Sequence, residues 1–72
     1  MNLREVQRLE LLVEATPGME PRGWRFWTRQ ERGRAPKRIY ALECVDTRSG
    51  CPFVLRSREE YDAKFAEQHR EE

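Results

Sequence analysis

The stretch "RIYALECVDTRSGCPFVLR", residues 38–56, decides the fold, because it predicts two strands joined by a tight turn. Its first part, "RIYALECVD", is rich in the β-branched and aromatic residues that strands favour. In "DTRSG", residues 46–50, the Asp side chain can bond its own backbone and the Gly can adopt a positive φ. "CPFVLR" then predicts a short third strand, in which Pro52 indicates an edge position.

A first strand precedes this stretch, at residues 23–29, "GWRFWTR". Its side chains alternate in kind, which is typical of a strand with two distinct faces. We expect Trp24 and Phe26 to face the core. The opposite face would then carry Arg25, Trp27 and Arg29. Residues 31–37, "ERGRAPK", contain Gly and Pro and therefore predict the loop between the first two strands.

A helix is predicted at the N-terminus, where Asn2 and Glu5 form a capping-box pattern. Apolar residues then recur at helical spacing and form one stripe, which Leu11 does not join: Leu3, Val6, Leu9, Leu12 and Val13. "TPG", residues 16–18, ends this helix, because Pro disfavours the helical conformation in the residue before it and Gly frees the chain to turn. "MEPRG", residues 19–23, is expected to be a connector.

A second helix is predicted after the sheet, where Ser57 and Glu60 repeat the capping-box pattern and Tyr61 shares a face with Phe65. The predicted fold is α+β: a small single domain of order α-β-β-β-α, in which a three-stranded antiparallel meander packs with two helices on one face. Within the domain, residues 1–72, we expect the N-terminal helix in 1–16, the sheet in 23–57 and the C-terminal helix in 58–69.

The N-terminal segment "MNLREVQRLE" is charged and so does not resemble a signal peptide, and no apolar run approaches the roughly 18 residues of a membrane span. We therefore expect a cytoplasmic protein whose two cysteines stay reduced. We expect the turn to place Asp46 opposite Cys51. Cys44 then lies opposite Phe53, so we expect no disulfide between the two thiols.

The net charge of +1 conceals a strong polarisation along the chain. Residues 22–38 hold seven of the fourteen Lys and Arg and a single acid, Glu31, which gives them a net charge of +6. Residues 1–21 carry −2 and residues 39–72 carry −3. This distribution, a basic centre between two acidic ends, gives information about the binding partners of the protein and not about its fold. Twelve of the fourteen cations are Arg, which suits bidentate capture of phosphate or carboxylate, although a GC-rich genome would give the same bias.

Size and composition argue against an enzyme, because a chain of 72 residues has room for only a thin core. The single His, His69, lies in a charged tail with no nucleophile predicted beside it. The two cysteines form no C-x-x-C pair, and the four glycines are scattered instead of forming a phosphate-binding loop. We therefore expect a non-enzymatic protein without a metal and without cofactors.

The predicted order of elements resembles that of the double-stranded-RNA-binding domain. The RNA contacts of that family need Lys at the start of the last helix and a His-bearing loop between the first two strands. Here these places read "SREEYDAK" and "ERGRAPK". The resemblance therefore extends to topology alone, and we reject the RNA-binding role that it implies.

The segment "LECVDTRSGCPFVLRSREEYDAKF", residues 42–65, resembles the arm-binding domains of phage tyrosine recombinases. Those domains have a D-x-x-(S/T)-G turn before a strand, followed by a helix with an acidic start. The resemblance implies DNA read by a three-stranded sheet. The shared pattern is a hairpin turn before a capped helix, and we assign the chain to no family.

Residues 22–38 are the candidate binding surface. Cations interleaved with an exposed aromatic suit nucleic acid, because the cations neutralise phosphates while an indole stacks on a base. Trp and Arg are also typical of surfaces that bind proteins, so the partner could be an acidic protein surface. A hairpin whose charged residues are only solvated, and bind nothing, would have the same composition. The candidate residues are Arg22, Arg25, Trp27, Arg29, Arg32, Arg34, Lys37 and Arg38.

We expect a small regulatory binding protein, of the kind found in phages and mobile elements, that acts through this hairpin on nucleic acid or on a complex that handles nucleic acid. The alternative is an inhibitor or adaptor that docks on a host machine, such as RNA polymerase or a CRISPR-type nuclease complex, without touching nucleic acid. Neither function involves a membrane or a small-molecule substrate.

Overall fold

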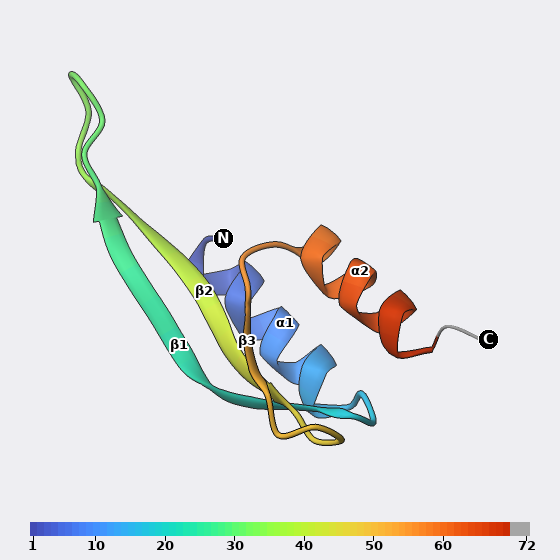
Figure 1. Cartoon of the computed structure of the whole chain (residues 1–72). Helices are drawn as coiled ribbons and strands as arrows, with labels where there is room; N and C mark the ends of the chain where they lie inside the picture. Colours follow the sequence, from blue (N-terminus) through green and yellow to red (C-terminus); the bar gives the residue numbers. More distant parts are fainter. Residues whose placement is uncertain (70–72) are drawn as a thin grey trace.

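The computed structural model describes residues 1–69 and has the order α-β-β-β-α (Figure 1). Its elements are α1 (Leu3–Glu14), β1 (Met19–Arg29), β2 (Lys37–Asp46), β3 (Pro52–Leu55) and α2 (Arg58–Gln68). The three strands form one antiparallel sheet of order β1-β2-β3. The predicted fold is therefore confirmed.

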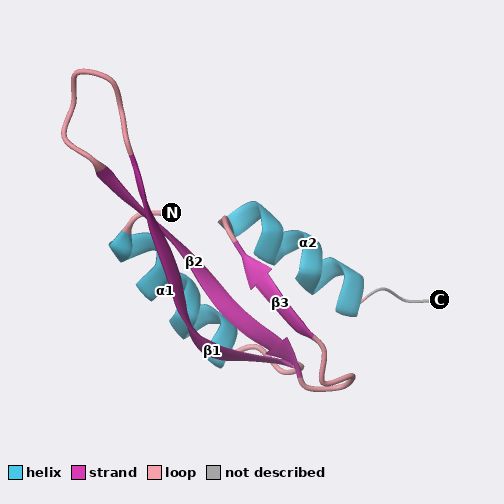
Figure 2. Ribbon diagram, turned by 60° about the vertical axis from the view of Figure 1, so that its left-hand side comes forward, coloured by secondary structure: helices cyan, strands magenta, loops and turns pink. Residues whose placement is uncertain are grey.

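Both helices lie on one face of the sheet, and the core lies between them and β2 (Figure 2). Leu42 and Cys44 of β2 are fully buried there, so the even-numbered residues of this strand face the helices. The odd-numbered residues face away from the helices, on what we call the open face of the sheet. The buried core consists of Val6, Leu9, Val13, Met19, Leu42, Cys44, Leu55 and Tyr61.

The capping box of α1 forms as expected. The Asn2 side chain accepts a hydrogen bond from the backbone amide of Glu5 at 2.8 Å, and the backbone amide of Asn2 donates to Glu5 Oε1 at 3.3 Å. Beyond the end of this helix, the Thr16 hydroxyl lies 2.7 Å from the Tyr61 hydroxyl of α2. This buried contact connects the two helices.

The first strand begins earlier than expected. Residues 19–22 belong to β1 and are not a connector, and Met19 is part of the core. The pairing of β1 with β2 shifts between Pro21 and Gly23, where Arg22 has no partner in the register. This β-bulge lets the strand continue through a Pro and a Gly, residue types that otherwise indicate a turn.

The β1–β2 hairpin is much longer than the helices that cover it. The twelve residues of α1 span about 18 Å at 1.5 Å per residue. The eleven residues of β1 span about 36 Å at 3.3 Å per residue. The far end of the hairpin, residues 26–39, therefore projects beyond the body, and we call it the arm (Figure 1). The molecule measures 50 × 21 × 19 Å as a result.

This mismatch corrects the expectation that Trp24 and Phe26 are buried in the core. Both lie on the helix-facing side of β1, in register with Leu42 and Tyr40. Their exposed fractions are nevertheless 38% and 57%. Trp24 lies beside Glu10 of α1, and Phe26 is in register with Tyr40, which pairs with Met1 just before α1 begins.

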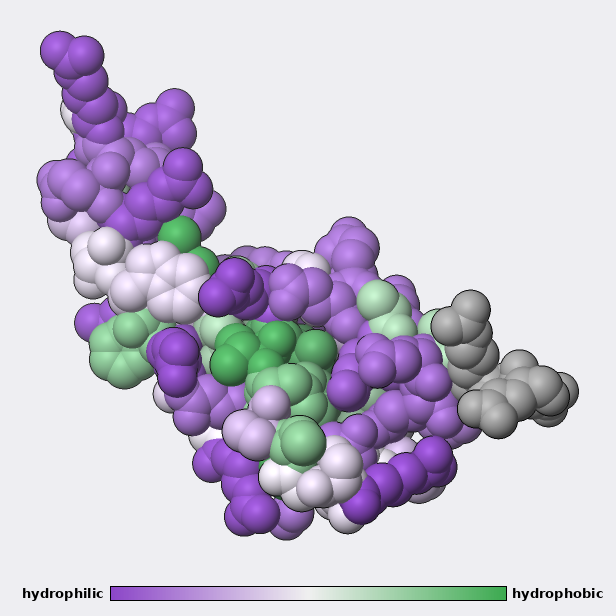
Figure 3. All heavy atoms as spheres, in the orientation of Figure 1, coloured by the Kyte–Doolittle hydropathy of each residue, from purple (hydrophilic) through white to green (hydrophobic). Residues whose placement is uncertain are grey.

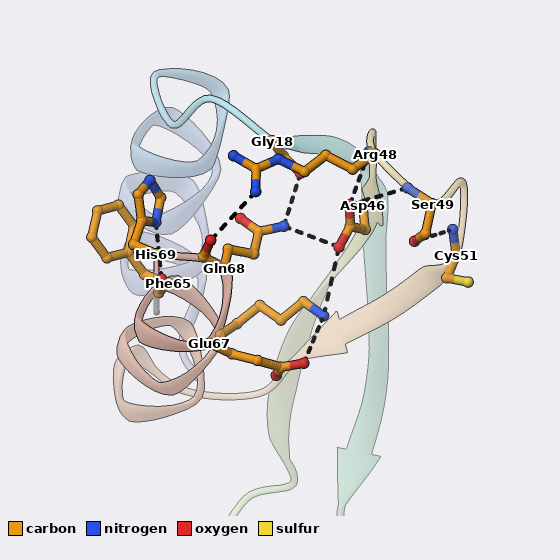
Figure 4. Close-up of polar contacts among 10 residues, drawn as sticks. Gly18, Asp46, Arg48, Ser49, Cys51, Phe65, Glu67, Gln68 and His69 are labelled. Atoms are coloured by element: carbon orange, nitrogen blue, oxygen red, sulfur yellow. Dashed lines mark hydrogen bonds and ion pairs between the residues drawn. The ribbon is translucent and has the colours of Figure 1, made fainter. Parts of the chain in front are cut away.

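Asp46 anchors the end of the sheet to α2 (Figure 4). Its carboxylate accepts hydrogen bonds from the Gln68 side chain at 3.1 Å and from the Arg48 amide at 2.9 Å. The same Gln68 amide donates to the Gly18 carbonyl oxygen at 3.0 Å, which connects α2 to the link between α1 and β1. Gly18 has a φ of +91° and leaves space for this contact, since a Cβ there would lie 3.2 Å from Gln68 Oε1.

These hydrogen bonds predict a dependence of stability on pH. The Gln68 amide, followed by the backbone amides of Arg48 and Ser49, holds the pKa of Asp46 below its usual value. A carboxylate with a lowered folded-state pKa stabilises the fold above its unfolded-state pKa of about 3.9 and loses that contribution as pH falls through its folded-state pKa. In urea titrations, Asp46→Asn should therefore unfold more easily than wild type at pH 7, and the difference should shrink below about pH 4. A difference that stays constant from pH 7 to pH 2 would contradict this role of Asp46.

The register places the two thiols apart, as predicted. Cys44 lies opposite Phe53, and the Asp46 amide donates to the Cys51 carbonyl oxygen at 2.9 Å. Both cysteines are free, with Cys44 buried and Cys51 exposed. Burial raises the pKa of the Cys44 thiol to about 12.

The two thiols should therefore react at very different rates. Cys51 is exposed and should react quickly with a thiol reagent at pH 8, whereas Cys44, which is buried and has a raised pKa, should react only after unfolding. Mass spectrometry of the native and the urea-unfolded protein would count one and two labels, respectively. Cys51→Ser should abolish native labelling, and rapid labelling of two thiols in the native protein would contradict the burial of Cys44.

Candidate nucleic-acid interface

The open face of the sheet carries three successive cross-strand rows of side chains. From the arm toward the body, the register pairs Arg29 with Lys37, then Trp27 with Ile39, then Arg25 with Ala41. This face includes Arg25, Trp27 and Arg29, as the alternation predicted. Both helices pack on the opposite side of the sheet (Figure 2).

Arg29 and Lys37 are two like charges placed directly opposite one another at the end of the ladder. Such a cross-strand pair destabilises a sheet unless an anion lies between the two charges. Within residues 1–69, neither side chain forms an ion pair. The pair thus presents two uncompensated positive charges on one face of the arm.

Trp27 lies in the next row, beside this pair. Its side chain is 42% exposed, and its cross-strand neighbour Ile39 is half-buried. The indole is therefore accessible from the open face. Hydrophilic residues cover the tip of the arm, whereas hydrophobic residues lie toward its base and on the body (Figure 3).

The helix-facing side of the hairpin holds a second aromatic group. The Tyr40 ring lies between Trp24 and Phe26, with centroid distances of 6.2 Å and 5.9 Å. The Trp24 indole N–H donates to Glu10 of α1 at 3.0 Å, so Trp24 ties the hairpin to the body. The Arg38 guanidinium lies 4.9 Å from the centre of the Phe26 ring, a cation–π contact.

The structure divides the predicted site residues into two groups. Three of the cations pair with nearby acids: Arg22 with Glu20 at 3.8 Å, Arg25 with Glu43 at 2.9 Å and Arg34 with Glu31 at 4.0 Å. No ion pair of residues 1–69 includes the other four, which are Arg29, Arg32, Lys37 and Arg38.

All four of the unpaired cations lie in the arm, whereas Arg22 and Arg25 lie nearer the body. Arg38 is on the face opposite Arg29, because residues 37 and 38 alternate along β2. The structure therefore brings Arg29, Lys37 and Trp27 together and leaves the remaining candidates around them.

Comparisons with protein-family models, with curated proteins and with solved structures find no match to this chain. Within residues 1–69, no three His, Cys, Asp or Glu residues come together in a way that could hold a metal ion. In the same part of the chain, both helices are too short and too polar to cross a membrane.

Proposed function

We propose that this protein is a small, non-enzymatic regulatory protein of the cytoplasm that binds nucleic acid through its arm. The observation that carries the proposal is the like-charged pair of Arg29 and Lys37 next to the exposed indole of Trp27. A phosphate between Arg29 and Lys37 would compensate two charges that otherwise repel each other. A base one row away could then stack on Trp27.

The shape and the charge of the arm support the same proposal. The arm projects from the body, so a long, thin polymer can reach it from either side (Figure 1). Half of the Lys and Arg residues of the chain lie in residues 22–38, with Glu31 as the only acid among them. A two-stranded ribbon also has dimensions that the major groove of duplex DNA admits.

The first test measures how binding depends on salt. If Arg29 and Lys37 share one phosphate and Arg32 and Arg38 contact one phosphate each, the logarithm of the binding constant should fall with the logarithm of the salt concentration at a slope of about −2.7 or steeper on duplex DNA, at about 0.9 per phosphate. The double variant Arg32→Glu, Arg34→Glu should lose most of this binding, because it removes two positive charges from the tip and adds two negative ones. Its melting temperature should barely change, because exposed charges contribute little to stability.

Arg4→Glu, Arg8→Glu is the matched control for this experiment. It changes the net charge by the same amount on the exposed surface of α1, away from the tip of the arm. It should bind like wild type apart from a small, non-specific loss. If wild type binds neither DNA nor RNA at low salt, the proposed function is wrong. In that case, loss of a captured protein partner by the arm variant would favour docking on an acidic protein surface.

The second test separates the roles of the two Trp residues. Trp27→Ala should weaken binding to single strands by about 1–3 kcal/mol, because it removes a stacking surface. It should have a smaller effect on stability than Trp24→Ala, which removes the contacts of Trp24 with Tyr40 and Glu10. Trp24→Ala should lower the free energy of unfolding by about 1 kcal/mol or more. If both variants lose the same amount of binding and Trp27→Ala is the less stable of the two, then Trp27 stabilises the fold and does not stack on a base.

A further inference from the structure

A hollow lies where the arm meets the body, and it brings together side chains that are far apart in the sequence. Arg29 and Lys37 of the arm line one part of it, and Arg56, which follows β3, lines another. Ile39 contributes an apolar wall, and Glu5 and Glu31 are the acids that line it. The hollow therefore adds a third cation, from the body, to the like-charged pair of the arm.

Both acids of the hollow have other partners. Glu5 accepts a hydrogen bond from the Asn2 amide at 3.3 Å, as part of the capping box of α1. Glu31 pairs with Arg34 at 4.0 Å, toward the tip of the arm. Neither acid forms an ion pair with a cation of the hollow within residues 1–69.

The backbone that carries Arg56 is held in place by the start of α2. The Arg56 amide donates to Glu60 Oε1 at 3.2 Å, and the Glu60 amide donates to the Ser57 hydroxyl at 3.2 Å. No ion pair of the described residues includes Arg56, and its side chain is exposed. Arg56 thus offers a charge-assisted hydrogen-bond donor from a fixed point of the body.

We infer that this hollow binds a backbone phosphate of the nucleic acid, with Arg56 joining Arg29 and Lys37 as its third cation. This inference rests on the proposed function and extends it from the arm to the body. One phosphate held by three cations accounts for the like-charged pair at the end of the ladder. It also defines the path of the bound strand, which would pass from the hollow over the neighbouring row of Trp27 and Ile39.

Arg56→Gln tests this inference, and Arg58→Gln is its matched control. The two variants lose the same charge two residues apart, but Arg58 pairs with Asp62 at 3.1 Å and lines a different hollow, between the helices. Arg56→Gln should weaken binding and make the salt slope shallower by at most about 0.7–0.9, the value for one whole phosphate on single-stranded or duplex nucleic acid, because Arg29 and Lys37 still contact the same phosphate. Arg58→Gln should retain the wild-type slope.

The outcomes distinguish this inference from the proposed function. If Arg56→Gln keeps the wild-type affinity and slope while Arg32→Glu, Arg34→Glu loses binding, the arm binds nucleic acid and the inference about the hollow is wrong. If wild type binds no nucleic acid, the proposed function itself fails and the inference fails with it. Equal slope changes in Arg56→Gln and Arg58→Gln would indicate a diffuse charge effect, which would also overturn a specific phosphate contact.

A second measurement separates a backbone phosphate from free phosphate. The side-chain Nε–Hε resonances of the arginines can be followed by NMR while wild type is titrated with a short oligonucleotide or with inorganic phosphate. We expect the oligonucleotide to shift the Arg29 and Arg56 resonances at much lower concentration than inorganic phosphate does. If only inorganic phosphate shifts these resonances, the hollow is a site for free anions. If neither probe shifts them, the hollow binds no phosphate. Either result overturns the inference.

Discussion

The difference in length between the hairpin and its helices governs the architecture of this protein. A strand rises more than twice as far per residue as a helix, so helices of twelve and eleven residues cannot cover a hairpin whose strands have eleven and ten. The core therefore forms only where Leu42 and Cys44 lie beneath α1 and α2. Everything beyond that point is a two-stranded ribbon, and the greatest concentration of positive charge in the chain lies there.

The body compensates for its thin core with polar contacts at the ends of its elements. The Thr16–Tyr61 hydroxyl contact connects the helices, and the Asp46–Gln68 contact connects α2 to the sheet. Both contacts join segments that are distant in the sequence. The body is thereby held together at its edges as well as by apolar packing.

The elements could be predicted from the sequence because their signals are local. The capping residues Asn2 and Ser57 mark the helix starts, and the Asp46 turn fixes the register that separates Cys44 from Cys51. The start of β1 was missed, because Pro21 and Gly23 indicate a turn where the chain instead forms a bulge within the strand.

The alternation of side chains also assigned Trp24 and Trp27 correctly to opposite faces. It could not show that Trp24 remains half-exposed, because a periodicity of two identifies a face and not what covers it. Arg56 could not be found as a neighbour of Arg29 from the sequence, because their proximity depends on how β3 ends against the base of the arm.

The projection of the arm has a consequence for how this protein can change over evolutionary time. A two-stranded ribbon outside the core is marginally stable, and its backbone hydrogen bonds should open far more often than those of β2 beneath the helices. Substitutions among its exposed residues therefore have little effect on the folding equilibrium, while they act directly on whatever the arm touches. On the proposed function, recognition would thus lie largely outside the part of the 72-residue chain that holds the core, so that selection could alter the specificity of the arm without first securing a more stable body.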